Sequence, residues 1–285
     1  MLARSALVAA AVLSSVATAQ SASDLLSGIS STCTSSVSNL LGSQFASCAD
    51  ISGLIPILTT SGSVVTPSAF ANSWLGTLCG QSNCSTSAIQ NATGIIDAGC
   101  SAELSAGNAV VTVARTAIAN FNTVKAAACL QQSSNSTYCV TDLLDKVQSG
   151  LNTQLTVSSL TSLSLSDLEK IPSSEVCDDC AHALTTKLLP VIESATTSSS
   201  AAGASGVSSS SISSAIGGYC GQSFLDGQVP SDIKQGSGSS SSSSSSGNGA
   251  VSSTSLTGGA ELSTGSWSKV AGVAGVGLAA AVMLV

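Results

Sequence analysis

The residues best suited to chemistry lie in one short stretch, EVCDDCAHAL, at residues 175–184. Cys177 and Cys180 stand three positions apart, and His182, the only histidine of the chain, follows two positions later. Thiols and an imidazole at such spacing occur in zinc sites, in redox dithiols and, in the order C-x-x-C-H, at covalently attached haem. The stretch therefore offers three chemistries, and the surrounding residues must allow one of them.

Each of these chemistries lacks a necessary part. Zinc needs four ligands, and no second cysteine pair stands near the three candidate ligands. Asp178 and Asp179 lie between the two cysteines and oppose the low thiol pKa that a redox dithiol requires. Ala181 occupies the position of the haem-binding histidine. We therefore predict no metal and no cofactor, and a structural disulfide role for the cysteines.

A hydrolytic site would have to use His182, because Ser–His–Asp and Cys–His arrangements need a histidine. Asp178, four residues earlier, could orient the ring on a helix, although surface Asp–His pairs at this spacing are common. The chain contains no G-x-S-x-G nucleophile elbow, and acidic pairs such as Asp142 with Asp145 are typical of a solvated helix face. Only 3% of residues are aromatic, which disfavours a sugar-binding cleft. We predict a non-enzyme, with a hydrolase that uses His182 as one alternative.

The cysteines as a set indicate a disulfide framework, because their number is even and the chain carries a secretion signal, described next. The ten residues are Cys33, Cys48, Cys79, Cys84, Cys100, Cys129, Cys139, Cys177, Cys180 and Cys220. Their order alone does not fix the pairing. On a helix, positions 177 and 180 share a face, so two separate bridges can leave from it. We expect Cys139, Cys177, Cys180 and Cys220 to form two bridges among themselves.

The N-terminus has the three parts of a secretory signal peptide. Arg4 supplies the positive charge, residues 6–12 form a short apolar core, and Ala17-Thr18-Ala19 is a small-residue cleavage site. The apolar core is too short to span a bilayer. We expect residues 1–19 to be removed before Gln20.

The C-terminus resembles a GPI-attachment signal. Small residues at 258–260 precede a polar spacer at 261–269 and an uncharged apolar tail at 270–285. A true tail anchor is the rival interpretation, but the tail is shorter than the roughly 20 residues that a spanning helix needs. We predict attachment at Gly258, with Ser255 and Gly259 as alternatives, and removal of residues 259–285.

Apolar residues recur at helical spacing through most of the intervening chain. The expected helices cover residues 25–45, 51–58, 67–80, 89–96, 110–121, 140–147, 176–191 and 212–219. Strand-like alternation is rare, so we predict an all-α, disulfide-stapled helical bundle over 20–235, with 20–135 and 136–235 as candidate sub-bundles. Residues 236–258 are almost wholly Ser, Gly and Thr, a composition typical of a disordered stalk.

The net charge bears on the partners of the protein, and three sequence motifs bear on its glycosylation. The net charge is −7 without a basic patch, which excludes nucleic acid as a natural partner. Three N-x-S/T sequons begin at Asn83, Asn91 and Asn135. Asn135 lies in a polar segment between two cysteines and is the best acceptor. Asn83 is the least suitable, because Cys84 must also form a disulfide.

Several motifs resemble a family of secreted fungal proteins, mostly from basidiomycetes, known only as a domain of unknown function. They are FASCADISGLIPILTTSGSV at 45–64, WLGTLCGQSNCS at 74–85, NSTYCV at 135–140, CDDCAHAL at 177–184 and CGQSFLDGQVP at 220–230. This resemblance covers about residues 30–235. It implies a cell-surface or wall-associated protein and brings no catalytic residues with it.

The cysteine spacing over residues 33–129 is also similar to that of elicitins, which are small all-α proteins that bind sterols. This likeness implies the bridges Cys33–Cys100, Cys48–Cys84 and Cys79–Cys129, although the first two intervals differ from the elicitin pattern.

From the two terminal signals and the sequons, we expect a GPI-anchored, glycosylated protein at the extracellular face of the plasma membrane or in the cell wall. Its expected role is structural or binding, with wall polysaccharide or surface proteins as partners. An extracellular lipid or sterol carrier is the alternative.

Overall fold

The computed structural model describes residues 29–54, 74–155, 167, 170–198 and 209–236. The predicted signal peptide, the attachment signal with Gly258 and all but the first residue of the predicted stalk lie outside these ranges. Within them the protein is helical, apart from one two-stranded sheet, as the sequence predicts. No helix in these ranges is both long and apolar enough to cross a bilayer.

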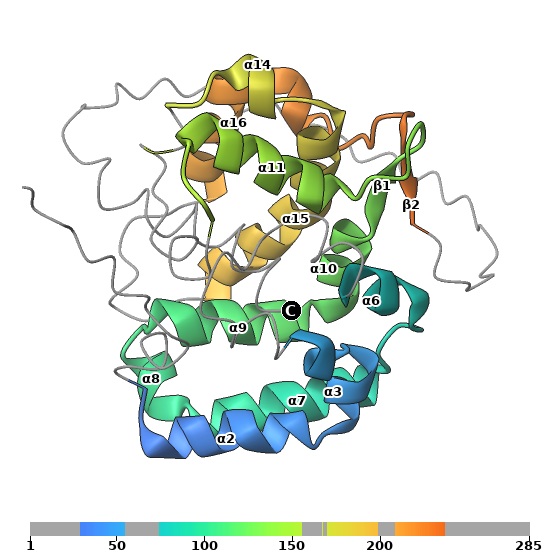
Figure 1. Cartoon of the computed structure of the whole chain (residues 1–285). Coiled ribbons are helices and arrows are strands. Elements are labelled where there is room, and N and C mark those ends of the chain that lie inside the picture. The colour runs from blue at the N-terminus through green and yellow to red at the C-terminus, as the bar shows by residue number, and fades with distance from the viewer. Residues whose placement is uncertain (1–28, 55–73, 156–166, 168–169, 199–208, 237–285) are drawn as a thin grey trace, which may run out of the picture.

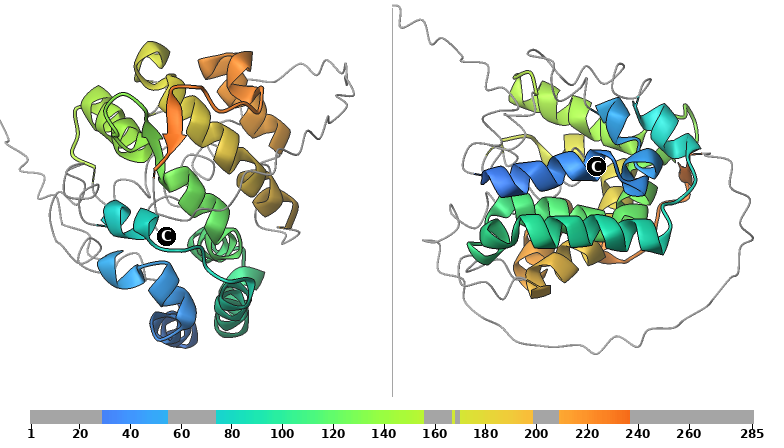
Figure 2. Two further views of the ribbon diagram at one scale, coloured as in Figure 1. Left: turned by 90° about the vertical axis from the view of Figure 1, so that its right-hand side faces the viewer. Right: turned by 90° about the horizontal axis from the view of Figure 1, so that it is seen from below.

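The first layer contains α2 (Ser31–Leu41), α3 (Gln44–Cys48) and α7 (Thr86–Gly99). Figures 1 and 2 show α2 and α7 side by side. Each helix begins after a serine whose hydroxyl accepts a hydrogen bond from a backbone N–H in the first turn, namely Ser30, Ser43 and Ser85. The predicted continuous helix over 25–45 is wrong, because Gly42 ends α2 and Ser43 caps a new helix.

The middle of the fold contains α6 (Gly76–Gly80), α8 (Ser101–Ser105), α9 (Ala109–Ala119) and α10 (Phe121–Ala128). Helix α6 ends at Gly80, as predicted. The helix expected over 110–121 instead divides at Asn120, whose side-chain amide donates to the carbonyl of Thr116 at the end of α9. Phe121 then begins α10 and meets Phe45 edge to face, with ring centroids 4.9 Å apart.

The second half of the fold contains α11 (Cys139–Leu151), α14 (Ser173–Val176), α15 (Asp179–Ser198), α16 (Ser209–Cys220) and the 3-10 turn η2 (Gln222–Leu225). Helix α15 packs on both α10 and α11, which places it between the two halves (Figure 1). The helix predicted over 176–191 begins at Asp179 instead. Cys177 therefore lies between α14 and α15 rather than on a shared helix face with Cys180.

A small antiparallel sheet was not expected. Strand β1 (Leu130–Gln132) pairs with β2 (Ile233–Gln235), and the backbone N–H of Gly236 donates to the carbonyl of Cys129 over 2.7 Å. The sheet joins the last described residues to the end of α10. Strands of three residues are too short to leave an alternating pattern in the sequence.

The apolar core is continuous across both candidate sub-bundles. Leu75, Leu78, Phe121 and Val124 belong to the same buried cluster as Leu184 and Leu188 of α15. The disulfides, in contrast, divide at residue 135, with three before this position and two after it. Non-covalent packing and the small sheet therefore hold the two halves together.

Candidate functional site

The stretch 175–184 is a covalent junction. Cys177 is bonded to Cys220 at the end of α16, and Cys180 is bonded to Cys139 at the start of α11. This confirms that these four residues pair among themselves. Because both thiols are consumed in separate bridges, this pair is neither a C-x-x-C disulfide nor a set of metal ligands.

Asp178 caps helix α15 and does not orient the histidine. Its Oδ1 accepts a hydrogen bond from the backbone N–H of Ala181 over 3.0 Å, and its Oδ2 forms an ion pair with Lys146 of α11. Lys146 also pairs with Asp142 one turn earlier, at 2.5 Å. The proposed pair between Asp178 and His182 is therefore wrong, because helix capping and the lysine engage both oxygens of the carboxylate.

His182 instead contacts the segment that follows α16. Its Nε2 lies 3.0 Å from Oδ1 of Asp226, and its ring stacks on Phe224 with centroids 4.9 Å apart. Asp226 also accepts a hydrogen bond from the backbone N–H of Gln228. This bond has the larger effect and the bond with His182 the smaller, and both lower the pKa of the Asp226 carboxyl. One turn further along α15, Thr186 donates to the carbonyl of Gln228. These contacts fasten residues 221–229 to α15.

A polar pocket of about 250 Å³ lies beside this junction. Its lining includes Asp178, Asp179 and Asp232 together with Gln132 and Ser134. Within the described ranges, no three His, Cys, Asp or Glu side chains are arranged to hold a metal ion. Acidic, amide and hydroxyl side chains therefore make up most of the lining of this pocket.

The six cysteines of the first half pair as Cys33–Cys100, Cys48–Cys84 and Cys79–Cys129. This is the pairing that the elicitin-type spacing implies. Since no cysteine of the chain is free, all ten serve to close the fold.

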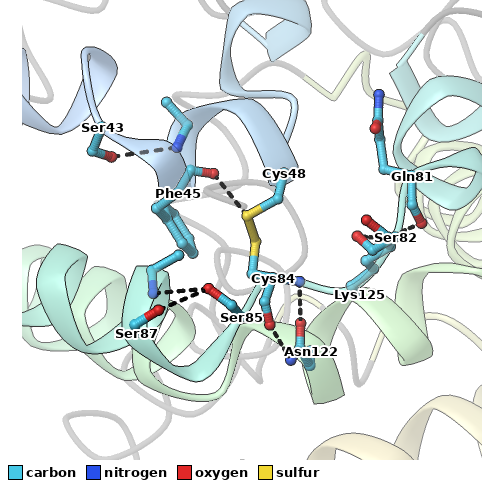
Figure 3. The surroundings of a disulfide bond; sticks show 12 residues. Ser43, Phe45, Cys48, Gln81, Ser82, Cys84, Ser85, Ser87, Asn122 and Lys125 are labelled. Atoms are coloured by element: carbon cyan, nitrogen blue, oxygen red, sulfur yellow. Dashed lines mark hydrogen bonds between the residues drawn. A yellow bond between two sulfur atoms is a disulfide. The ribbon is translucent and has the colours of Figure 1, made fainter.

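Two side chains of α10 hold the loop between α6 and α7, residues 81–85, in place (Figure 3). Nζ of Lys125 donates to the carbonyl oxygens of Gln81 and Ser82. The side-chain amide of Asn122 donates to the carbonyl of Cys84 and accepts from its backbone N–H. Burial lowers the pKa of Lys125. Sequence reasoning missed both residues, and the one available signal was a lysine placed among apolar residues in a helix.

A second buried charge, Glu103, ties α8 to the start of α2. Its Oε1 accepts from the backbone N–H of Ser30 over 2.7 Å, and the side chain is 7% exposed. In a capping box the third helical residue supplies such a carboxylate. Here that residue is Cys33, which is bonded to Cys100, and the carboxylate comes from the helix that follows Cys100. The hydroxyl and the backbone N–H of Ser30 lower the pKa of Glu103.

All three sequon asparagines are exposed. Asn83 lies in the loop between α6 and α7, and Asn91 lies on the exposed face of α7. Neither side chain is hydrogen-bonded to a described residue. Asn135 lies in the turn after β1, where its oxygen accepts from the backbone N–H of Thr137 and its amide donates to Gln132. The structure therefore presents the acceptor nitrogens of Asn83 and Asn91 more freely than that of Asn135.

Comparison with known proteins identifies a family without identifying an activity. No curated protein and no solved structure matches the chain. The family described as "Domain of unknown function (DUF7729)" matches residues 19–229, a span that begins at the predicted cleavage site and ends shortly before β2. Since this match covers well over half of the sequence, the chain belongs to the DUF7729 family.

Proposed function

We propose that this protein is secreted, N-glycosylated and held by a GPI anchor at the outer face of the plasma membrane or in the cell wall, where it has a structural or binding role. The pairing of all ten cysteines carries the proposal, because such a framework is typical of the oxidising secretory route. The exposed sequons and the resemblance to secreted fungal proteins support the same location.

A role without catalysis is favoured by the use of the reactive side chains. Cys177 and Cys180 each form a disulfide, Asp178 caps α15, and His182 connects α15 to Asp226. The two thiols cannot act as nucleophiles while they are bonded, and Asp178 would have to give up its cap or its ion pair to act as a base. His182 is the one of the four that could still act as a base, through the ring nitrogen that does not face Asp226. We propose that the protein binds wall polysaccharide or other surface proteins through its folded domain.

Treatment of intact cells with a phosphatidylinositol-specific phospholipase C tests the anchor. The mature protein, without residues 259–285, should appear in the medium after treatment. A chain truncated after residue 258 should enter the medium without the enzyme. Retention on cells after treatment, together with a mature chain that keeps residues 270–285, would contradict the proposal.

Binding of a lipid or sterol is the second candidate function, and the disulfide pattern of the first half favours it. The three bridges before residue 135 connect the same cysteines, in order, as the elicitin-like spacing implies. Protein released from cells can be mixed with a fluorescent sterol and titrated with unlabelled sterol. Saturable displacement would support a carrier role, and a fluorescence signal no larger than that of the unfolded, reduced protein would exclude it.

A further inference from the structure

In the sequon Asn83-Cys84-Ser85, the acceptor asparagine is exposed, whereas the other two residues already take part in bonds of the folded protein. Asn83 is exposed, whereas Cys84 is 4% exposed and bonded to Cys48. Ser85 caps α7, where its hydroxyl accepts from the backbone N–H of Ala88 over 3.2 Å. Asn122 engages both backbone polar groups of Cys84 (Figure 3). A sequon is recognised through its hydroxyl residue as well as its asparagine, and here the fold has already engaged the hydroxyl.

We infer that Asn83 is an N-glycosylation site that accepts its glycan only before the Cys48–Cys84 disulfide closes. The folded loop has room for a glycan on the exposed side chain, so a chain modified early can still fold and form the bridge. Once the bridge and the Asn122 contacts are in place, residues 83–85 can no longer extend into a transferase. The fold thus tolerates the glycan and prevents its later addition. This inference rests on the proposed secretory route.

Two reactions compete for the same few residues. In one, a bond forms between Nδ2 of Asn83 and C1 of a lipid-linked oligosaccharide, while the bond from C1 to the lipid diphosphate breaks and the amide loses a proton. In the other, the thiols of Cys48 and Cys84 lose two protons and two electrons to the disulfide of a protein oxidant, which becomes a dithiol.

The two reactions also fall in the same time window. Asn83 and Cys84 are adjacent and reach the lumen together, and Cys48, 36 residues earlier in the chain, is then already available to Cys84. Disulfide formation takes seconds or longer. The faster reaction therefore decides the fate of each chain, and we expect the secreted protein to be a mixture of two glycoforms at Asn83.

Translation of the full chain in the presence of microsomes tests the order of events. Site-resolved glycopeptide mass spectrometry should find partial occupancy at Asn83 in the wild type and a higher occupied fraction in Cys48→Ser. A thiol reductant should raise the wild type to the level of the variant. Cys139→Ser, which opens a bridge in the other half of the fold, is the matched control and should leave Asn83 at the wild-type level. The glycosylated wild-type fraction should still contain the Cys48–Cys84 bond.

Equal occupancy of Asn83 in the wild type and in Cys48→Ser would overturn the inference, as would an equal rise in Cys139→Ser. Glycosylation of Asn91 and Asn135 in the same samples reports whether the chain has entered the microsomes. If neither of them carried a glycan and the chain stayed outside the microsomes, the proposed secretory route itself would be wrong. Occupied Asn91 with an Asn83 that stays empty in Cys48→Ser would refute the inference alone.

Discussion

Nζ of Lys125 lies 2.7 Å from the carbonyl oxygen of Gln81 and 2.9 Å from that of Ser82, inside the protein, where the side chain is only 4% exposed. A buried ammonium group is unfavourable unless other groups replace its water. The two carbonyls do so here and in return fix the loop that leads to Cys84. Helix α10 thus sets the position of a loop 44 residues earlier in the chain.

Replacement of Lys125 by methionine should remove this support while keeping most of the side-chain volume. We expect Lys125→Met to lower the free energy of unfolding by about 1.5–3 kcal/mol, the usual contribution of hydrogen bonds to a charged group. Denaturant unfolding with the disulfides intact measures the change. The control is Lys234→Met, because Lys234 is exposed and its Nζ donates to the hydroxyl of Ser136 at the surface. Similar losses in both variants would show that the Lys125 contacts are not special.

The cap at Asp178 can be separated from its ion pair by two substitutions. Asp178→Ala removes both and should destabilise the protein by about 0.5–2 kcal/mol, the range measured for lost N-caps. Asp178→Asn keeps a good capping oxygen and loses only the charge that pairs with Lys146, so the loss should be smaller. Thermal unfolding compares the two variants. An asparagine variant as unstable as the alanine variant would assign the stability to the ion pair instead.

Glu103 should make stability depend on acid pH. Its pKa in the folded protein lies below the ordinary value of 4.5, so the unfolded chain binds protons first as the pH falls. The stability that the carboxylate adds is present above this value and is lost as the pH falls through the folded pKa. Glu103→Gln should therefore be less stable than the wild type near neutral pH, and the difference should shrink in acid. Denaturant unfolding over a pH series measures this difference, and a constant gap would contradict the prediction.

His182 should protect residues 221–229 against local unfolding. In His182→Ala, Phe224 and Asp226 of this segment lose their contacts with α15. The backbone amides of the segment should therefore exchange hydrogen faster, with Gln228 as the reporter. Lys187→Ala, on the same helix, serves as the control. Unchanged exchange in His182→Ala would show that the contacts of His182 do not hold the segment. Loss of a hydrolytic activity without any change in exchange would favour the hydrolase alternative.

Periodicity predicted the helices whose apolar faces are uninterrupted. Helix α7 buries Ala92 and Ile96 and α11 buries Leu144 and Val147, as their spacing indicates. The breaks at Gly42 and Asn120 were missed because the apolar rhythm continues across them. Periodicity reports which residues face the core, and it is insensitive to a turn that changes the helix axis while keeping that face inward.

The partners of the candidate site residues were less accessible to prediction. The expectation of two bridges among Cys139, Cys177, Cys180 and Cys220 is confirmed, but it assumed that Cys177 and Cys180 share a helix face and left the partner of each open. His182 finds Asp226, 44 residues later, and no local pattern marks that pairing. The nearer Asp178 was the obvious candidate, yet its place directly before α15 commits it to the helix end. Local spacing therefore identified the reactive residues, whereas the tertiary fold determined their partners.

The pairing of β2 with β1 determines how the domain responds to tension. A pull on the chain beyond residue 236 first loads the hydrogen bonds between Ile233–Gln235 and Leu130–Gln132, and the bond from Gly236 to Cys129. If these yield, the segment after Cys220 can extend, but Cys220 is covalently joined to Cys177. Extension therefore stops after a short length of chain, and the two bridges at Cys177 and Cys180 then transmit the force into α11 and α15 as covalent tension.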